Sequence, residues 1–236
     1  GVKMQVITNP FGAPLALDSI TFTFLGQEIW LLSALFIIAW LVLMMNVMNW
    51  LDGIPGLASG VGIIASIVMF VLSIQGYHTV DQSTITIMSI ALAASLIAFI
   101  FFDFSPPRLL LGDTGSMLLG FLLGTFAIFS GGKIATALLI MGFPVLDSIW
   151  VIVRRVLTGK SPFKGDLAHL HHRLLRAGLT ERKALLLNYT ICGIFGIIAL
   201  TLENARQKFI ALLLVAAIMV ITATVVVLFE KHGRRS

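Results

Sequence analysis

Long apolar runs separated by short polar segments dominate the chain. Seven of these runs reach or approach the roughly 20 residues that a helix needs to cross a bilayer. They cover 29–48, 57–76, 84–102, 116–130, 134–153, 184–202 and 209–229. Because backbone groups in hydrocarbon must hydrogen bond within their own segment, such runs form helices. The pattern therefore predicts an all-α fold, a polytopic transmembrane helix bundle with about seven spans.

The composition agrees with this fold class. The chain is 58% hydrophobic and 11% charged, against roughly 25% charged residues in a soluble domain. Residues 1–28 are more mixed and predict a short strand pair or a surface loop. Since no linker-like stretch divides the sequence, we interpret 1–236 as a single domain. It starts at Gly1 without a signal-peptide pattern, which we interpret as a piece of a longer protein.

One long polar segment interrupts the apolar pattern, at 154–183: RRVLTGKSPFKGDLAHLHHRLLRAGLTERK. It holds eight of the sixteen Lys and Arg residues. Basic loops between spans face the cytoplasm, and counting spans from this loop places 49–56, 103–115 and the tail after 229 on the same side. Twelve Lys and Arg residues then lie inside and four outside. This distribution favours phosphates or anionic headgroups as partners, and not nucleic acid.

The first polar motif on this face is NVMNWLDGIPG. Asn46 and Asn49 are three residues apart and share a helix face. Amides at membrane depth are costly unless paired, so they are expected to face protein or a water-filled cleft. Asp52 precedes residues that break the helix. Its alternative role is structural, as the N-cap of the next span.

The second motif is GDTGS, which begins the span after the Pro106–Pro107 pair. Small residues such as Gly112 let a ligand approach the backbone, and a helix start favours phosphate. Mg²⁺ prefers few carboxylates together with phosphate oxygens, so Asp113 is a candidate metal ligand. The alternative is again an N-cap, formed by Asp113 or Thr114.

The third motif gathers His169, His171 and His172 within the basic segment. Three histidines beside cationic groups could bind a pyrophosphate, transfer a proton or bind a transition metal. Asp147, in the preceding span, lies close enough along the helix to Arg154 and Arg155 to pair with either of them.

Together these motifs resemble the polyprenyl-phosphate N-acetylhexosamine-1-phosphate transferases of glycosyltransferase family 4. The stretches NVMNWLDGIPGLASG and LLLGDTGSMLLGF carry part of the resemblance. The most specific stretch is GFPVLDSIWVIVRRVLTGKSPFKGDLAHLHHRLLRAGLT, which is similar to the bacterial undecaprenyl-phosphate GlcNAc-1-phosphate transferase branch. The family contributes lipid-linked sugars to peptidoglycan, teichoic acid and the O-antigen of lipopolysaccharide.

The resemblance implies an enzyme that transfers a phospho-N-acetylhexosamine, with GlcNAc-1-phosphate favoured, from a UDP-sugar to polyprenyl phosphate, releasing UMP. It implies Mg²⁺, with Mn²⁺ as an alternative, and a multi-pass plasma-membrane protein with a cytoplasmic active site; a homodimer is compatible with it. Carried over by motif, the metal ligand is Asp113. The catalytic residues are Asp113, Asp52, His171 and His172, and the substrate-binding residues are Asn46, Asn49, Gly112, Arg154, Arg155 and His169.

Two departures from the family pattern keep other interpretations open. Pro55 stands where the family has a second Asp, three residues after Asp52. The chain also contains no adjacent acidic pair, whereas the family carries an Asp-Asp pair in an earlier loop, which we expect upstream of Gly1. The alternatives are a non-catalytic fragment or paralogue, and a membrane transporter, which predicts polar groups at mid-membrane and on both sides.

Overall fold

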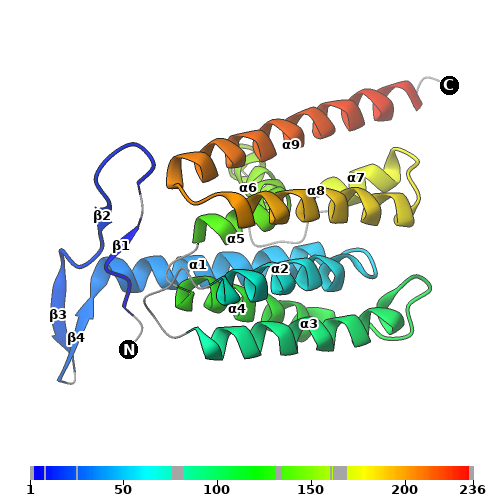
Figure 1. Ribbon diagram of the computed structural model, residues 1–236. Helices are drawn as coiled ribbons and strands as arrows, with labels where there is room; N and C mark the ends of the chain where they lie inside the picture. The colour runs from blue at the N-terminus through cyan, green and yellow to red at the C-terminus, as the bar shows by residue number, and fades with distance from the viewer. Residues whose placement is uncertain are drawn as a thin grey trace.

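The computed structural model describes residues 3–7, 9–24, 26–75, 82–130, 134–159, 161 and 169–233, without the side chains of Phe24 and 227–233. Over these residues the chain forms two small two-stranded antiparallel sheets followed by a helical bundle (Figure 1). The strands are β1 (Val6–Ile7), β2 (Leu15–Ala16), β3 (Thr21–Phe24) and β4 (Gln27–Trp30). The helices are α1 (Leu31–Leu51), α2 (Leu57–Ile74), α3 (Ser83–Asp103), α4 (Gly112–Phe129), α5 (Ile134–Ile140), α6 (Gly142–Leu157), α7 (Leu170–Arg176), α8 (Glu181–Thr201) and α9 (Ala205–Gly233).

The predicted membrane bundle is confirmed. In the described part of the chain, six helices are long and apolar enough to cross a membrane: α1, α2, α3, α4, α8 and α9. Each corresponds to a predicted span. The helix α4 begins at Gly112, four residues before the predicted start at 116. This shift matters because it brings Asp113 inside the helix.

The remaining predicted span, 134–153, is not one straight helix. The helices α5 and α6 meet at an angle of 86° on either side of Met141. Pro144 lies in the first turn of α6 and has no N–H to donate to the Ile140 carbonyl, so the helical hydrogen bonds cannot run through this point. Hydropathy alone predicted the right length of apolar sequence here but missed the bend.

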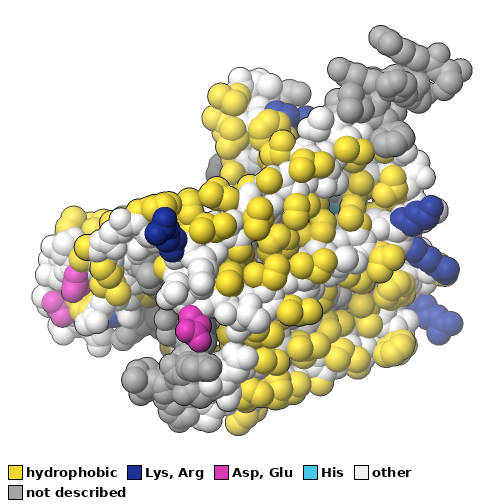
Figure 2. Space-filling view, turned by 45° about the horizontal axis from the view of Figure 1, so that its top comes forward, with side chains coloured by type: hydrophobic (Ala, Val, Ile, Leu, Met, Phe, Trp, Pro, Cys, Tyr) yellow, Lys and Arg dark blue, Asp and Glu magenta, His cyan; other side chains and the backbone are white. Residues whose placement is uncertain are grey.

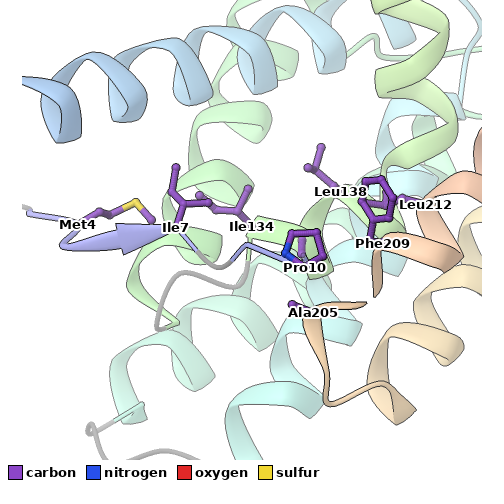
Figure 3. Close-up of a pocket in the computed structure, with 9 residues that line it drawn as sticks. Met4, Ile7, Pro10, Ile134, Leu138, Ala205, Phe209 and Leu212 are labelled. Atoms are coloured by element: carbon purple, nitrogen blue, oxygen red, sulfur yellow. The ribbon is translucent and has the colours of Figure 1, made fainter. Parts of the chain in front are cut away.

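The mixed N-terminal segment forms strand pairs, one of its two predicted outcomes. β3 pairs with β4 from Thr21–Trp30 to Phe24–Gln27, and β4 leads directly into α1. The segment that carries β1 covers an apolar pocket of about 200 Å³ beside α5 and α9 (Figure 3). Met4, Ile7 and Pro10 line it together with Ile134, Ala135, Leu138, Ala205, Phe209 and Leu212.

Small residues let α4 lie directly against α1. A side chain at Gly120 would collide with the backbone of Met44, and Trp40 Nε1 donates a hydrogen bond to the Gly124 carbonyl at 3.0 Å. Glycine at such crossings allows two membrane helices to approach closely. The same packing fixes the end of α1 beside the start of α4.

The helices run back and forth, so that alternate connections lie at the same end of the bundle. Figure 1 shows the α1–α2 connection, the α3–α4 connection and α7 at the right-hand end, with the strands and the α8–α9 connection at the left. Lys and Arg side chains also gather at the right-hand end (Figure 2). The three polar motifs therefore meet at one end, as the count of spans predicted.

We expect cysteines introduced at Leu110 and Thr158 to be labelled from the same side of a sealed membrane, and a cysteine at Asn204 from the opposite side. The physical reason is the alternation of the helices. A membrane-impermeant maleimide on right-side-out and inverted vesicles measures this. The native Cys192 is buried, which keeps the background low. Labelling of all three positions from one side would contradict the arrangement.

Candidate active site

Asn49 and Asp113 join the first two motifs. Asn49 Nδ2, in the last turn of α1, donates to Asp113 Oδ1 at 2.9 Å and to Ser116 Oγ at 3.1 Å. Asp113 is exposed in the first turn of α4, whereas the N-cap of α4 is Leu111. The N-cap alternative for Asp113 is therefore wrong. Its carboxylate instead lies at the positive end of the helix, exposed and hydrogen-bonded to Asn49 of α1.

Gly112 gives the start of α4 its shape. Its φ is +66°, in the left-handed region where a residue with a Cβ is strained. It is exposed, and a Cβ at this position would meet no atom within 4 Å. Backbone conformation, and not crowding, therefore requires glycine next to Asp113.

Asp52 ends α1. As the C-cap, its N–H donates to the carbonyls of Met48 and Asn49, while Gly56 is the N-cap of α2. The predicted helix termination is confirmed, but the alternative that Asp52 caps the next span is wrong. The side chain is half-buried, and its chemistry depends on its neighbours.

Two neighbouring carboxylates act on Asp52. Partial burial, the negative charge of Asp103 and that of Asp113 raise the pKa of Asp52 from its usual 3.8 to about 7, while a hydrogen bond from the Gly112 backbone opposes the shift. Like charges at close range disfavour the ionised form. Asp52 therefore takes up a proton more readily than an exposed carboxylate does.

Sequence inspection missed Asp103 as a member of this group. The residue is fully buried at the end of α3, and its Oδ2 accepts hydrogen bonds from Gly56 N at 3.1 Å and Ser59 Oγ at 2.6 Å. Among the described residues its Oδ1 has no hydrogen-bond partner. The available signal was a single acid at the end of an apolar run, just ahead of the Pro pair.

The histidines lie against the turn that follows Asp52. A Cβ built on Gly53 would fall 2.6 Å from His171 Nε2 and 2.9 Å from His172 Nε2, so only glycine fits. The rings of His169 and His171 stack with centroids 5.7 Å apart, and His169 lies at the same distance from Trp50. The third motif therefore contacts the first directly.

The buried His171 is neutral near pH 7. Burial, His172 and His169 lower the pKa of His171 to about 3, and burial followed by His169 and Arg176 lowers the pKa of His172. Within the described residues, His171 Nε2 is buried without a hydrogen-bond partner. A neutral imidazole offers one donor and one acceptor, so these rings can serve as hydrogen-bonding groups.

Asp147 holds the histidine segment in place. Its Oδ2 lies 2.9 Å from His169 Nδ1, and its Oδ1 accepts a hydrogen bond from Leu170 N at 3.0 Å. The expected ion pair with Arg154 or Arg155 is replaced by these contacts. Asp147 lies seven and eight residues before these arginines in the same helix, beyond the i, i+3 and i, i+4 spacings at which helical side chains pair. Asp147 thus orients His169, a role that local spacing could not reveal.

The other predicted site residues lie further from this cluster. Asn46 donates to the Val42 carbonyl of its own helix at 2.7 Å, one turn before Asn49. Arg154 is exposed in the last turn of α6. Arg155 is buried, and its Nε donates to the Ser161 carbonyl at 2.7 Å. This hydrogen bond joins the last turn of α6 to Ser161.

In the described ranges, no three or more His, Cys, Asp or Glu side chains form a complete set of metal ligands. Asp52, Asp103 and Asp113 nevertheless form an acidic group, in which burial and the two neighbouring negative charges raise the pKa of Asp52. Carboxylates of this kind suit a hard cation whose remaining ligands are water and phosphate oxygens.

We expect Asp147→Ala to lower the free energy of unfolding by about 1–3 kcal/mol, because it leaves Leu170 N and His169 Nδ1 without their acceptor. Asp147→Asn retains an oxygen for Leu170 N and should cost less. A double-mutant cycle with His169→Ala in detergent measures the coupling, with the exposed Asp18→Ala as control. Fully additive effects of Asp147→Ala and His169→Ala would contradict the pairing.

Comparison with known proteins agrees with the geometry. A protein of Bacillus subtilis named "Probable undecaprenyl-phosphate N-acetylglucosaminyl 1-phosphate transferase" is 31% identical over 243 residues, which cover 98% of this chain and 65% of that protein. The decaprenyl-phosphate N-acetylglucosaminephosphotransferase of Mycolicibacterium smegmatis is 32% identical, over 82% of this chain and 51% of that protein. The undecaprenyl-phosphate alpha-N-acetylglucosaminyl 1-phosphate transferase of Thermotoga maritima is 31% identical, over 74% and 52%.

The chain spans about half to two-thirds of the length of these relatives. Residues 3–131, more than half of the chain, match the family described as Glycosyl transferase family 4. This range includes the Asn49–Asp52 turn, the buried Asp103 and the Asp113 helix start. The chain therefore belongs to glycosyl transferase family 4.

Proposed function

We propose that this protein transfers a phospho-N-acetylhexosamine, GlcNAc-1-phosphate in the favoured case, from a UDP-sugar to a polyprenyl phosphate in the membrane. The observation that carries the proposal is the meeting of three motifs at one end of the bundle. Asn49 contacts Asp113, and His171 and His172 lie against Gly53 beside Asp52. The names of the relatives support the same chemistry.

The reaction is a phosphoryl transfer between two anions. An oxygen of the lipid phosphate attacks the sugar-linked phosphorus of the UDP-sugar, a P–O bond forms, and the bridging P–O bond breaks so that UMP leaves. The product is a lipid-linked sugar pyrophosphate. Catalysis of such a step consists mainly of positioning the two phosphates and stabilising their charge.

The acidic cluster fits a divalent cation, and we propose Mg²⁺, with Mn²⁺ as the alternative, held by Asp113. When bound, such an ion neutralises charge on the phosphates. The chain's own contribution is positional. Asn49 fixes the Asp113 carboxylate, and Asp52 lies beside it in the turn that we assign to the nucleotide sugar.

We assign the histidines to the sugar-nucleotide pyrophosphate. A neutral His171 can donate from Nε2 to a phosphate oxygen while Asp147 keeps His169 in a fixed orientation. The exposed Arg154, in the last turn of α6, adds positive charge at the start of the basic segment 154–183, which contains the histidines. We place this end of the bundle at the cytoplasmic face of the plasma membrane, where a soluble donor meets a lipid acceptor.

The decisive experiment is an exchange assay on the purified chain in liposomes that contain polyprenyl phosphate. Radiolabel from UMP should enter UDP-GlcNAc. Asp113→Asn should abolish exchange at unchanged membrane abundance, because the amide keeps the hydrogen-bonding shape but loses the negative charge needed for the cation. Thr224→Val, which removes a hydroxyl at an exposed position of α9, is the control. No exchange by the wild-type chain would favour the non-catalytic alternative.

The pH dependence tests the acidic cluster. We expect kcat/KM for the UDP-sugar to rise as pH increases through about 7, because Asp52 is protonated below that pKa and ionised above it. Asp103→Asn removes a repelling charge and should move the rising limb to lower pH. Initial rates across pH measure this. If the rising part of the pH profile stays at the same pH in Asp103→Asn, the charge of Asp103 does not act on Asp52.

A further inference from the structure

The peptide unit of Gly56 is held from two sides by helices that are distant in sequence. Its N–H donates to Asp103 Oδ2 of α3 at 3.1 Å, and its carbonyl accepts a hydrogen bond from the Tyr189 hydroxyl of α8. Gly56 is buried and has a φ of +86°. The Gly56 carbonyl also accepts from Gly60 N and Ser59 Oγ of α2, so the Tyr189 hydroxyl adds a contact from another helix where the chain turns from α1 into α2.

The position of Tyr189 depends on two glycines of this region. A Cβ at Gly60 would collide with the Tyr189 ring, and a Cβ at Gly56 would lie 3.5 Å from its hydroxyl oxygen. The ring therefore lies along the first turn of α2 and reaches the Gly56 carbonyl. A tyrosine that only filled space would not need its hydroxyl at a buried backbone acceptor.

Asp103 supports the same turn from the other side. Besides Gly56 N, it accepts from Ser59 Oγ at 2.6 Å in the first turn of α2. Removing this acceptor would leave the buried Gly56 N–H unpaired and leave Ser59 Oγ with only its 3.2 Å hydrogen bond to the Gly56 carbonyl. An unpaired buried donor costs more than the mean value of a hydrogen bond. The acid thus ties the end of α3, just before the α3–α4 connection, to the turn.

The clamped turn carries the groups that face the substrate. Asp52 starts it, and Gly53 is in contact range of His171 and His172. The histidines precede α8 by a short connection, so Tyr189 belongs to the helix that follows the histidine segment. One hydroxyl therefore links the Asp52 turn to α8, the helix that follows the histidines in the chain.

We propose that Asp103 and Tyr189 are positioning residues that set the distance between Asp52 and the histidines for the UDP-sugar. This inference rests on the proposed function. It predicts that loosening the clamp weakens nucleotide-sugar use, although neither side chain needs to touch the substrate.

The test compares Tyr189→Phe, Asp103→Leu and Asp103→Asn. Phenylalanine keeps the ring and removes only the hydroxyl, while leucine removes the acceptor and asparagine retains one oxygen acceptor. Above the rising limb of the pH profile, Tyr189→Phe should raise KM for UDP-GlcNAc about tenfold, and Asp103→Leu should raise it more. In Asp103→Asn, KM for UDP-GlcNAc should stay within a few-fold of the wild-type value. KM for the polyprenyl phosphate should change little in all three.

Hydrogen–deuterium exchange provides a readout that does not need activity. Peptides that cover residues 52–60 should exchange faster in Tyr189→Phe and Asp103→Leu than in the wild type. Ser95→Ala, which removes an exposed hydroxyl of α3 bonded to Ala91 in its own helix, is the matched control and should leave both readouts unchanged.

The outcomes separate the two proposals. Unchanged exchange in Tyr189→Phe would overturn the clamp, and faster exchange with an unchanged KM would overturn its positioning role. An inactive wild type would overturn the proposed function while the exchange measurement still tests the clamp. Should Asp103→Leu fail to fold, Tyr189→Phe and Asp103→Asn suffice for either decision.

Discussion

The close approach of α4 to α1 at Gly120 determines where the charged groups of this protein can lie. With no side chain between the two backbones, the last turn of α1 lies beside the first turn of α4, and Asn49 reaches Asp113. A larger residue at position 120 would push α1 and α4 apart, and it would thereby also move Asn49 away from Asp113. A packing requirement in the middle of the bundle thus supports a polar contact at its end.

That polar end combines opposite electrostatic conditions at short range. Burial, together with the negative charges of Asp103 and Asp113, raises the pKa of Asp52, whereas burial keeps His171 neutral. Ionised groups at a bilayer surface would normally be hydrated or paired. Here the acids suit a cation, and the neutral imidazoles offer hydrogen bonds to an anion without adding to the charge.

The sequence predicted those features that depend on local pattern. Six spans follow from hydropathy, and the residues in the Asn49–Asp52 turn, at Asp113 and in the histidine segment follow from short motifs. The bend before Pro144, the pairing of Asp147 with His169 and the roles of Asp103 and Tyr189 depend on tertiary contacts. Gly56 and Tyr189 are separated by 133 residues, so no periodicity connects them.

Pro55 illustrates how the fold changes the meaning of a sequence departure. At that position the family resemblance predicts a second carboxylate, and its absence suggests an acid-poor site. Asp103 nevertheless reaches the same turn from α3, so that a third carboxylate acts on Asp52 in addition to Asp113. Proline also fixes its own φ and restricts the residue before it. The turn therefore loses one side-chain charge but gains rigidity, which lowers the entropy lost when a ligand is bound against it.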